Sequence, residues 1–194
     1  MEEMLRLLLP KILQDQISFE IYRSQSKDDL LSSLPARLRG YSTWLPASWR
    51  IFILVDRDDD DCIELKKQLE KISRNSSLIA KTRASRKSYQ VINRIAIEEL
   101  EAWFFGDMEA VRAAYPKVST IEKREKYRDP DNIKGGTWES FEKILQDAGY
   151  FKGGLRKIEL ARTISPHLVP VRNRSKSFQV FYGTIIEIMN EPTS

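Results

Sequence analysis

The sequence lacks the features that would place it in an oxidising compartment or in a membrane. One residue in 194 is a cysteine, Cys62, so no internal disulfide is possible. The longest apolar runs, Leu7–Pro10 and Ile51–Val55, are far too short to span a bilayer. The first residues are acidic and lack the basic region that opens a signal peptide. We therefore expect a cytoplasmic protein that does not associate with membranes.

Histidine is equally scarce, which restricts the chemistry of any catalytic or metal site, since imidazole is the commonest metal ligand and acid–base group. The only histidine, His167, follows Ser165 and Pro166 at an expected helix end, where a structural role is the simpler interpretation. There is no internal repeat and no low-complexity tract. Hydrophobic residues make up 41% and charged residues 31% of the chain, which is the balance of a folded domain. Carboxylates are therefore the candidate ligands.

Charges of the two signs are concentrated in different parts of the chain, although the net charge is only +4. Residues 56–70 contain seven acidic residues against three basic ones, and residues 152–176 contain seven basic residues against Glu159 alone. An acidic centre with a basic C-terminal third suits a metal site that acts on a polyanion. A solvated surface with uneven charge would have the same composition.

The hydrophobic pattern predicts an α/β fold whose second half is mostly helical. The expected strand Arg50–Val55 contains the apolar run Ile51–Val55 without alternation, which is typical of a parallel strand buried on both faces. Ser26, Asp107 and Thr137 are the expected helix caps, and Pro10 is expected to bend or end the first helix. The other expected strands are Ile17–Tyr22, Leu78–Lys81 and Tyr89–Ile95; the expected helices are Met1–Leu13, Asp28–Leu38, Cys62–Ile72, Ile97–Phe105, Met108–Tyr115, Trp138–Ala148, Leu155–Ile164 and Ser177–Met189; and Lys117–Gly136 is an expected surface loop. This order indicates an open, mainly parallel sheet flanked by helices, with a helical C-terminal part.

An acidic run follows the clearest strand directly. Asp56 and Asp58 leave the strand end as it turns, and ligands of open parallel sheets bind beyond the carboxyl ends of strands. The two carboxylates can therefore converge on one point, where Mg²⁺ (or Mn²⁺) would convert their repulsion into coordination. Asp59, Asp60 and Asp61 open the next helix, where acids stabilise the helix dipole, so a structural role is the first interpretation for these three and a role at or next to the metal is the alternative. The pattern also fits an aspartate-based phosphotransfer enzyme with Asp56 as the nucleophile.

A second group of acids follows the last expected strand. Glu98 and Glu101 are three residues apart, so they share one face of a helix, and Glu99 lies between them. Acids that open a helix just after a strand lie near the sheet edge. We expect Glu98 and Glu101 to join Asp56 and Asp58 in catalysis, and Glu99 to join the same two aspartates as a metal ligand. The alternative is a favourable first turn of a helix.

Five basic residues are candidates for contacts with a nucleic-acid backbone, either DNA or RNA. Arg172, Arg174 and Lys176 precede the last helix, where cations and hydroxyl groups beside a helix N-terminus form a phosphate-binding surface. Lys134 and Lys152 each precede a pair of glycines, as in a short phosphate loop, but without the Walker spacing. Solvated loops are the alternative for both regions.

Linked blocks of sequence carry a resemblance to a known family. They are Leu54–Asp58 with Cys62 and Leu65–Lys66, Asn93–Asp107, Tyr127–Asp131 with Lys134–Glu139, Ala148–Tyr150 and Asn173–Phe178. Together they cover nearly the whole chain and resemble the bacterial family catalogued as domain of unknown function 4276, which is regarded as Toprim-like. The resemblance implies a Toprim/Rossmann-like α/β core over residues 1–116, and a helical, basic extension over residues 117–194 packed on the same domain.

Toprim domains bind Mg²⁺ for phosphodiester chemistry, with a glutamate after a first strand and Asp-x-Asp after a later one. By this resemblance Asp56 and Asp58 are the Asp-x-Asp pair, and Glu98, Glu99 and Glu101 are the best candidates for further ligands. The sequence begins in a helix and not in the strand that would end in that glutamate. Either it starts inside a longer natural chain, or the first Toprim strand and one ligand are missing.

These features together predict a Mg²⁺-dependent Toprim-like nuclease. Genes of this kind are often partnered with ATPases in phage defence, so the resemblance also implies an ATPase partner. One alternative is a non-catalytic regulatory or effector subunit of an ATPase-containing complex. The other is the aspartate-based phosphotransfer enzyme.

Overall fold

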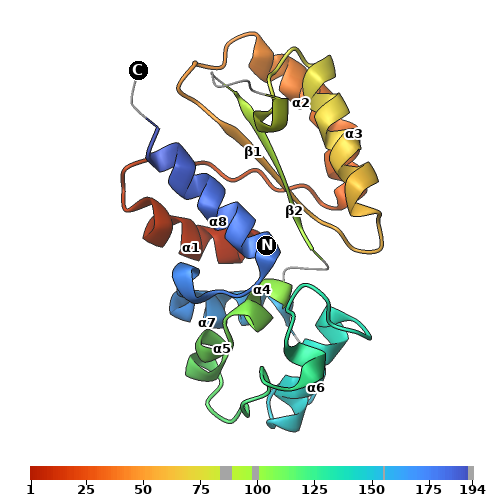
Figure 1. Cartoon of the computed structure of the whole chain (residues 1–194), viewed down its shortest axis with the longest axis vertical. Helices are drawn as coiled ribbons and strands as arrows, with labels where there is room; N and C mark the ends of the chain where they lie inside the picture. Colours follow the sequence, from red (N-terminus) through yellow and green to blue (C-terminus); the bar gives the residue numbers. More distant parts are fainter. Residues whose placement is uncertain (84–88, 98–100, 155, 192–194) are drawn as a thin grey trace. The chain divides into compact units, whose positions relative to one another are not determined.

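The computed structural model describes residues 1–83, 89–97, 101–154 and 156–191 (Figure 1). Within these ranges the chain is mixed α/β, with helices predominating, as the sequence predicts. The helices are α1 (Glu2–Leu13), α2 (Lys27–Ser42), α3 (Cys62–Asn75), α4 (Glu101–Gly106), α5 (Met108–Ala114), α6 (Thr137–Asp147), α7 (Lys157–Ile164) and α8 (Lys176–Met189). The strands are β1 (Ile51–Asp56) and β2 (Val91–Ala96), and the 3₁₀ turns are η1 (Lys81–Arg83), η2 (Glu125–Tyr127), η3 (Ser165–His167) and η4 (Pro170–Arg172).

The chain forms two compact units. Unit 1 contains residues 1–21 and 97–191, and therefore α1 and α4 to α8. Unit 2 contains residues 22–96, and therefore α2, β1, α3 and β2. Both sides of the predicted boundary after residue 116 lie in unit 1. None of the described helices combines the length and the apolar character that a transmembrane span requires.

The sheet of unit 2 is small, open and parallel. β1 pairs with β2 from Ile51↔Val91 to Asp56↔Ala96, which confirms two predicted strands. The predicted strand Leu78–Lys81 contributes only an isolated parallel bridge from Ala80 to Val91, after which the chain enters η1. The prediction of a strand over Ile17–Tyr22 is wrong, because this segment has no regular structure and most of its apolar side chains, including Phe19, are exposed instead of packed.

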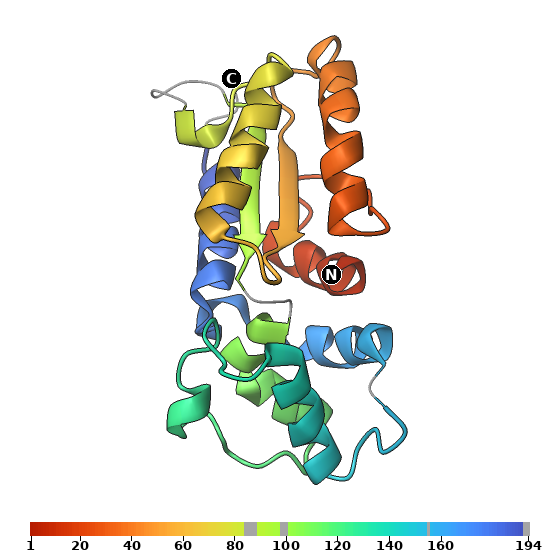
Figure 2. The same cartoon turned by 90° about the vertical axis from the view of Figure 1, so that its right-hand side faces the viewer.

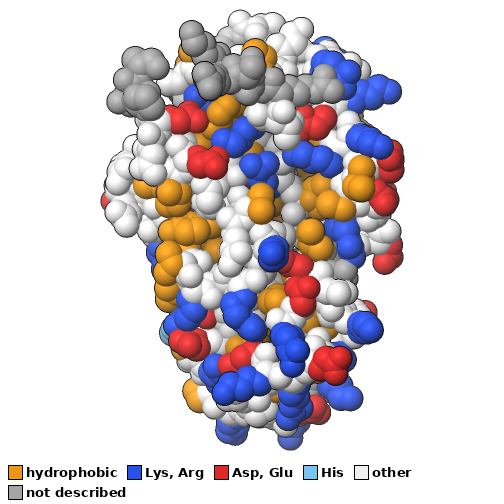
Figure 3. All heavy atoms as spheres, viewed as in Figure 1, with side chains coloured by type: hydrophobic (Ala, Val, Ile, Leu, Met, Phe, Trp, Pro, Cys, Tyr) orange, Lys and Arg blue, Asp and Glu red, His pale blue; other side chains and the backbone are white. Residues whose placement is uncertain are grey.

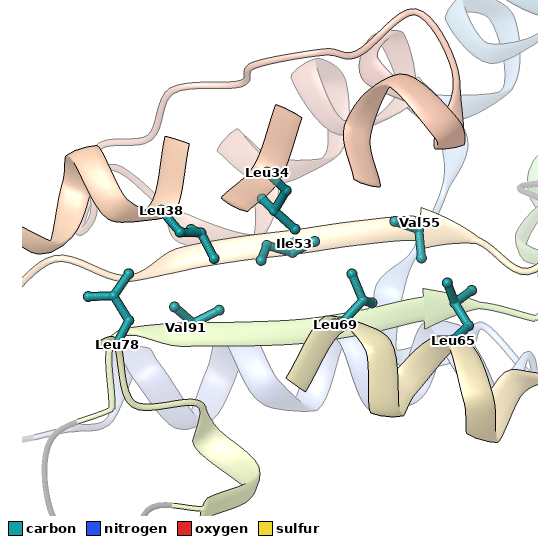
Figure 4. Packing of buried hydrophobic residues seen from close by; sticks show 8 residues of the cluster. All are labelled: Leu34, Leu38, Ile53, Val55, Leu65, Leu69, Leu78 and Val91. Atoms are coloured by element: carbon teal, nitrogen blue, oxygen red, sulfur yellow. The ribbon is translucent and has the colours of Figure 1, made fainter. Parts of the chain in front are cut away.

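Both helices of unit 2 pack on one face of its sheet (Figure 2). Figure 4 shows their leucines meeting the inward side chains of the strands. The cluster consists of Leu34 and Leu38 of α2, Leu65 and Leu69 of α3, Ile53 and Val55 of β1, Val91 of β2, and Leu78. The leucines of each helix are four residues apart and therefore lie on one helix face. Burying each one fully contributes about 1.5–3 kcal/mol. At the start of α2, the Ser26 hydroxyl accepts a hydrogen bond from the Asp29 amide at 3.1 Å, so the predicted cap is confirmed.

A buried polar cluster joins α3 to β2 beside this core. Asn93 is two residues from Val91 and shares its face of the strand. Its side-chain amide donates to Glu70 at 3.1 Å and to the Ser73 hydroxyl at 3.4 Å. The Lys66 ammonium donates to the Asn93 carbonyl at 2.7 Å and lies 3.1 Å from the Glu70 carboxylate. Burial raises the pKa of Glu70, but hydrogen bonds from Thr82, Asn93 and Lys66 outweigh it, so the pKa lies below its ordinary value.

The lowered pKa of Glu70 predicts a pH-dependent contribution to stability. The contribution is complete above the ordinary pKa of about 4.3 and is lost as the pH falls through the lower folded-state value. We expect Glu70→Gln to lower the free energy of unfolding by about 1 kcal/mol at pH 7, because the charged acceptor of Lys66 is lost. Urea unfolding at pH 7 and at pH 3.5 measures this difference, which should be smaller at the lower pH. An equal difference at both pH values would contradict the assignment.

The helices of unit 1 start and end as the sequence predicts in some places and not in others. The predicted cap Asp107 is confirmed, since its carboxylate accepts from the Ala110 amide at 3.2 Å at the start of α5. The prediction that Thr137 caps α6 is wrong: Gly136, with φ 85°, is the N-cap and Thr137 is the first helical residue. α1 continues past Pro10 to Leu13. Pro10 has no N–H to donate within the helix, and burial of four apolar side chains along α1 offsets this lost hydrogen bond: Met4, Leu8, Ile12 and Leu13.

Candidate functional site

The turn after β1 is built by the strand before it and the helix after it. β1 ends at Asp56, which by strand alternation lies on the face opposite Val55. The backbone then reverses at Asp58, whose φ of 50° is in the left-handed region that aspartate tolerates better than most residues. Asp61 closes the turn as the N-cap of α3, accepting from the amides of Ile63 and Glu64 at 2.9 Å. The structural role predicted for Asp61 is therefore confirmed.

A lysine from the start of α2 lies in the middle of this turn. The Lys27 ammonium is 2.8 Å from a carboxylate oxygen of Asp58 and 2.7 Å from one of Asp60. It also donates to the Arg57 carbonyl at 3.0 Å. The Lys27 side chain is 19% exposed, whereas the two carboxylates are each about half exposed, at 49% and 50%. One cation of the chain itself therefore gathers three oxygen atoms of the turn, and the carboxylates remain accessible from solvent.

The charge of Lys27 is maintained by the turn. Partial burial lowers the pKa of Lys27, but the hydrogen bonds and negative charges of Asp58 and Asp60 raise it above the ordinary lysine value overall. The ammonium is therefore fully protonated at neutral pH. The turn and the first residue of α2 form a complete ion cluster, which we call the acidic turn: Lys27, Arg57, Asp58 and Asp60.

The predicted carboxylate site is only partly covered by the described residues. The structure brings Asp58 together with Asp60, whereas the sequence predicts Asp58 with Asp56. Glu98 and Glu99 lie outside the described residues. Glu101 belongs to unit 1, where it is 3% exposed and lies 3.8 Å from the Lys157 ammonium. Over the ranges that the structure describes, no three His, Cys, Asp or Glu side chains form a group arranged to hold a metal ion. The convergence of Asp56, Asp58 and a glutamate stays a prediction.

The acidic turn nevertheless has the donor set that a hard divalent cation prefers. Mg²⁺ binds carboxylate and carbonyl oxygens, usually with one or two protein carboxylates and several waters. The turn supplies two carboxylates and one carbonyl. One oxygen of each already surrounds a positive charge, the Lys27 ammonium. Asp58 and Asp60 would therefore hold such an ion, in competition with Lys27.

The basic residues predicted to contact nucleic acid differ in their surroundings within unit 1. Arg172 donates two hydrogen bonds to the buried Asp107 carboxylate, at 2.7 and 3.0 Å, and one to Glu109 at 2.5 Å. The other four are exposed side chains: Arg174, Lys176, Lys134 and Lys152. On the face drawn in Figure 3, lysine and arginine side chains lie among acidic ones without merging into one continuous basic surface. Arg172 thus has a structural function of its own.

Sequence reasoning missed Lys27, which is the central residue of the acidic turn. It is 30 residues from Arg57 in the sequence and lies next to Ser26 as the first residue of α2. No local pattern distinguishes it from other lysines on the chain. The contact arises from the packing of α2 beside β1, which spacing and composition do not specify.

Three of the segments that carry the family resemblance meet inside unit 1. Asp131 accepts hydrogen bonds from the Ser175 hydroxyl at 2.7 Å and from the Ser177 hydroxyl at 3.0 Å. The Ser177 hydroxyl also accepts from the Trp103 indole at 2.8 Å, and Asn173 donates to the Trp103 carbonyl at 2.8 Å. These bonds tie three distant parts of the sequence to one another.

A comparison with family models shows which family the chain belongs to. The model described as domain of unknown function (DUF4276) matches residues 1–186. The chain belongs to the DUF4276 family. No curated protein and no solved structure matches this DUF4276 chain. The predicted family is confirmed, and the description of DUF4276 assigns it no activity.

One glycine of the DUF4276 chain shows how closely its segments pack. A Cβ atom at Gly106 would lie 1.9 Å from the side-chain oxygen of Asn173 and 2.9 Å from the Ser175 amide nitrogen. Only a residue without a side chain fits between these groups. Gly106 therefore belongs to the structural network of unit 1.

Proposed function

We propose that this DUF4276 chain is a Toprim-like, metal-dependent phosphodiesterase that binds Mg²⁺ or Mn²⁺ at the acidic turn. The observation that carries the proposal is the gathering of two half-exposed carboxylates and a carbonyl around one cation beyond the carboxyl end of a parallel strand. That end of a parallel sheet is where ligands of α/β proteins bind. The predicted nuclease activity and the predicted DNA or RNA substrate rest on this proposal.

In this scheme each residue of the turn has a separate task. Asp58 and Asp60 hold the metal ion, and the left-handed backbone at Asp58 directs the turn back over the strand end. Lys27 neutralises the carboxylates when no metal is bound, which limits their mutual repulsion. The bound ion would activate a water and stabilise the leaving oxygen of a phosphodiester. Asp56, Glu98, Glu99 and Glu101 remain the candidates for further catalytic or ligand roles, and Arg174, Lys176, Lys134 and Lys152 for backbone contacts.

Cleavage of labelled single-stranded DNA, duplex DNA and RNA with MgCl₂, with MnCl₂ and with EDTA tests the proposal. We expect metal-dependent cleavage of at least one substrate. The double variant Asp58→Asn, Asp60→Asn should reduce its rate by about 100-fold or more, because both proposed carboxylate ligands are lost while the turn geometry is retained. Absence of metal-dependent cleavage by the wild-type chain would refute the enzymatic proposal.

The matched control for this variant is Asp15→Asn, Asp28→Asn. Both residues are exposed aspartates, and Asp15 has the same left-handed backbone as Asp58, with φ 59°. The control removes the same number of charges and should cleave like the wild type. Equal losses in both double variants would show that net charge, and not the acidic turn, determines the rate.

One observation favours the second candidate, a non-catalytic subunit of an ATPase-containing complex. The Lys27 ammonium already satisfies the acidic turn, so its carboxylates have a structural explanation without a metal ion. The hypothesis of a non-catalytic subunit predicts that nucleic acid stays intact after incubation with either metal. It also expects co-purification of the chain with an ATPase encoded beside it.

A further inference from the structure

Two exposed tryptophans lie side by side on the connection between α2 and β1. Trp44 and Trp49 are each 56% exposed, and their ring centroids are 6.1 Å apart at an interplanar angle of 74°. Tyr41 of α2 packs edge-on against Trp44 at 5.5 Å, with its own ring partly buried on the core of unit 2. Single exposed apolar side chains are ordinary, whereas a contiguous exposed patch indicates an interaction site.

The connection holds these rings in place through its backbone. The amides of Trp44 and Leu45 donate to the Tyr41 carbonyl at 3.1 and 2.8 Å, and the Trp49 amide donates to the Pro46 carbonyl at 3.0 Å. The Arg50 guanidinium donates to the Ala47 carbonyl at 2.8 Å and to the Trp49 carbonyl at 3.1 Å. Because these bonds fix the main chain that carries the rings, less backbone order has to be gained when a ligand binds, which lowers the entropic cost of binding.

In the stretch of sequence that contains the two tryptophans, every charged residue is basic. Residues 30–55 contain three arginines and no acidic residue. Arg37 and Arg39 are exposed, and neither has a carboxylate partner within the part of the chain that the structure describes. Arg37 is one helical turn before Tyr41, so it lies on the same stripe of α2 as the aromatic cluster. The aromatic surface therefore has the unpaired Arg37 beside it, with a second unpaired arginine, Arg39, two residues further along α2, which fits a ligand that carries both flat rings and negative charge.

We propose that Trp44 and Trp49, with Arg37 and Arg39, form a binding surface for single-stranded nucleic acid. Unpaired bases stack on aromatic side chains regardless of sequence, and arginines beside them hold the phosphates. Bases in a duplex are already stacked on one another and cannot do this. The steep angle between the indoles prevents a parallel clamp, so the two rings would stack on separate bases. The choice of nucleic acid as the ligand rests on the proposed function, because a nuclease requires a surface that binds its substrate.

The position of the surface suits a substrate that also reaches the acidic turn. The connection precedes β1 and the turn follows it, at the two ends of one six-residue strand (Figure 2). A strand of this length spans about 20 Å. Both sites belong to unit 2, so a single strand bound at the tryptophans extends along the unit toward the carboxylates.

Fluorescence anisotropy of a labelled 20-nucleotide oligothymidine with the full chain, in EDTA and at low salt, tests this surface. We expect Trp44→Ala, Trp49→Ala to weaken binding at least tenfold and to abolish the quenching of tryptophan emission by unlabelled oligonucleotide, although Trp103 and Trp138 remain. Arg37→Ala, Arg39→Ala keeps the rings and should lower the slope of log affinity against log salt by about 1.4. This second variant decides the question if the first one does not fold.

Two controls separate the surface from general effects and from the proposed hydrolysis. Ile63→Ala removes an exposed apolar side chain of α3, and Lys71→Ala, Arg74→Ala removes two exposed charges of the same helix. Both should bind like the wild type, and because EDTA removes the metal, the measured binding does not depend on the proposed hydrolysis. Wild-type chain that does not bind the oligonucleotide, or tryptophan and arginine variants that bind it equally well, would overturn the inference. Self-association that depends on the tryptophans in place of oligonucleotide binding would overturn it too.

Discussion

Replacing Arg172 with methionine is expected to lower the free energy of unfolding by about 2–3 kcal/mol, less than for a fully buried pair because the Arg172 side chain is 35% exposed. Methionine keeps most of the apolar stem but removes the charge that pairs with Asp107. The Asp107 carboxylate has no solvent exposure, so it cannot exchange the lost guanidinium for water. The remaining donors to Asp107 are the amides of Val169 and Ala110. Breaking a buried ion pair by removing one partner is costly because the other charge stays buried.

The size of this effect makes it easy to measure. A chain of this length loses about 2–4 °C of melting temperature per kcal/mol, so Arg172→Met should melt roughly 5–10 °C below the wild type. The same variant tests the predicted role of Arg172 in nucleic-acid binding. An unchanged melting temperature together with weaker oligonucleotide binding would assign the residue to the ligand and not to the fold.

The matched control is Arg162→Met, also in unit 1. Arg162 makes two hydrogen bonds to the Glu3 carboxylate, at 2.8 and 3.1 Å, which is the geometry that Arg172 makes with Asp107. This pair is exposed, with 62% of the Arg162 side chain and 30% of the Glu3 side chain accessible. Exposed pairs contribute little because water replaces the lost partner. Equal melting temperatures of the two variants would contradict the role of burial.

The parts of the fold that the sequence predicted are those fixed by local chemistry. The unbroken apolar run at Ile51–Val55 identified a buried parallel strand, and Ser26 and Asp107 identified two helix starts, because each signal lies within a few residues of its structural cause. Ile17–Tyr22 also has a local pattern that predicts a strand, but the structure has no strand there. Its alternation suits a strand, but no described neighbour pairs with it, and a strand forms only with a partner.

The candidate site was less predictable, because it depends on contacts between distant segments. The acidic run marked the turn correctly as the dense carboxylate feature, but which two carboxylates meet is decided by Lys27, 30 residues away. Arg172 was a reasonable phosphate contact from its neighbours in sequence, yet its partner Asp107 lies 65 residues away. Charge patterns identify where ions gather, and tertiary packing decides which ions pair.

Replacing Lys27 with methionine is the sharpest test of whether the acidic turn is a cation site or a closed ion cluster. Two carboxylates about 5 Å apart repel by roughly 3 kcal/mol at an effective dielectric constant of 20. Asp58 and Asp60 are half exposed, so solvent screening reduces the loss of stability to about 1 kcal/mol. With the competing ammonium gone, we expect Mg²⁺ and Mn²⁺ to bind at least tenfold more tightly than to the wild type.

Thermal unfolding against MgCl₂ concentration, at constant ionic strength, measures this gain. Magnesium at 100 times its dissociation constant adds about 2.7 kcal/mol of stability, so the melting temperature of Lys27→Met should rise by several degrees. Lys67→Met is the matched control, since Lys67 pairs with Glu64 at 2.7 Å on the exposed face of α3, and it should show no such rise. Adding Asp58→Asn to Lys27→Met should remove the magnesium effect. If Lys27→Met is destabilised and neither metal restores it, the three oxygens serve Lys27 alone, and the chain is better explained as a non-catalytic subunit.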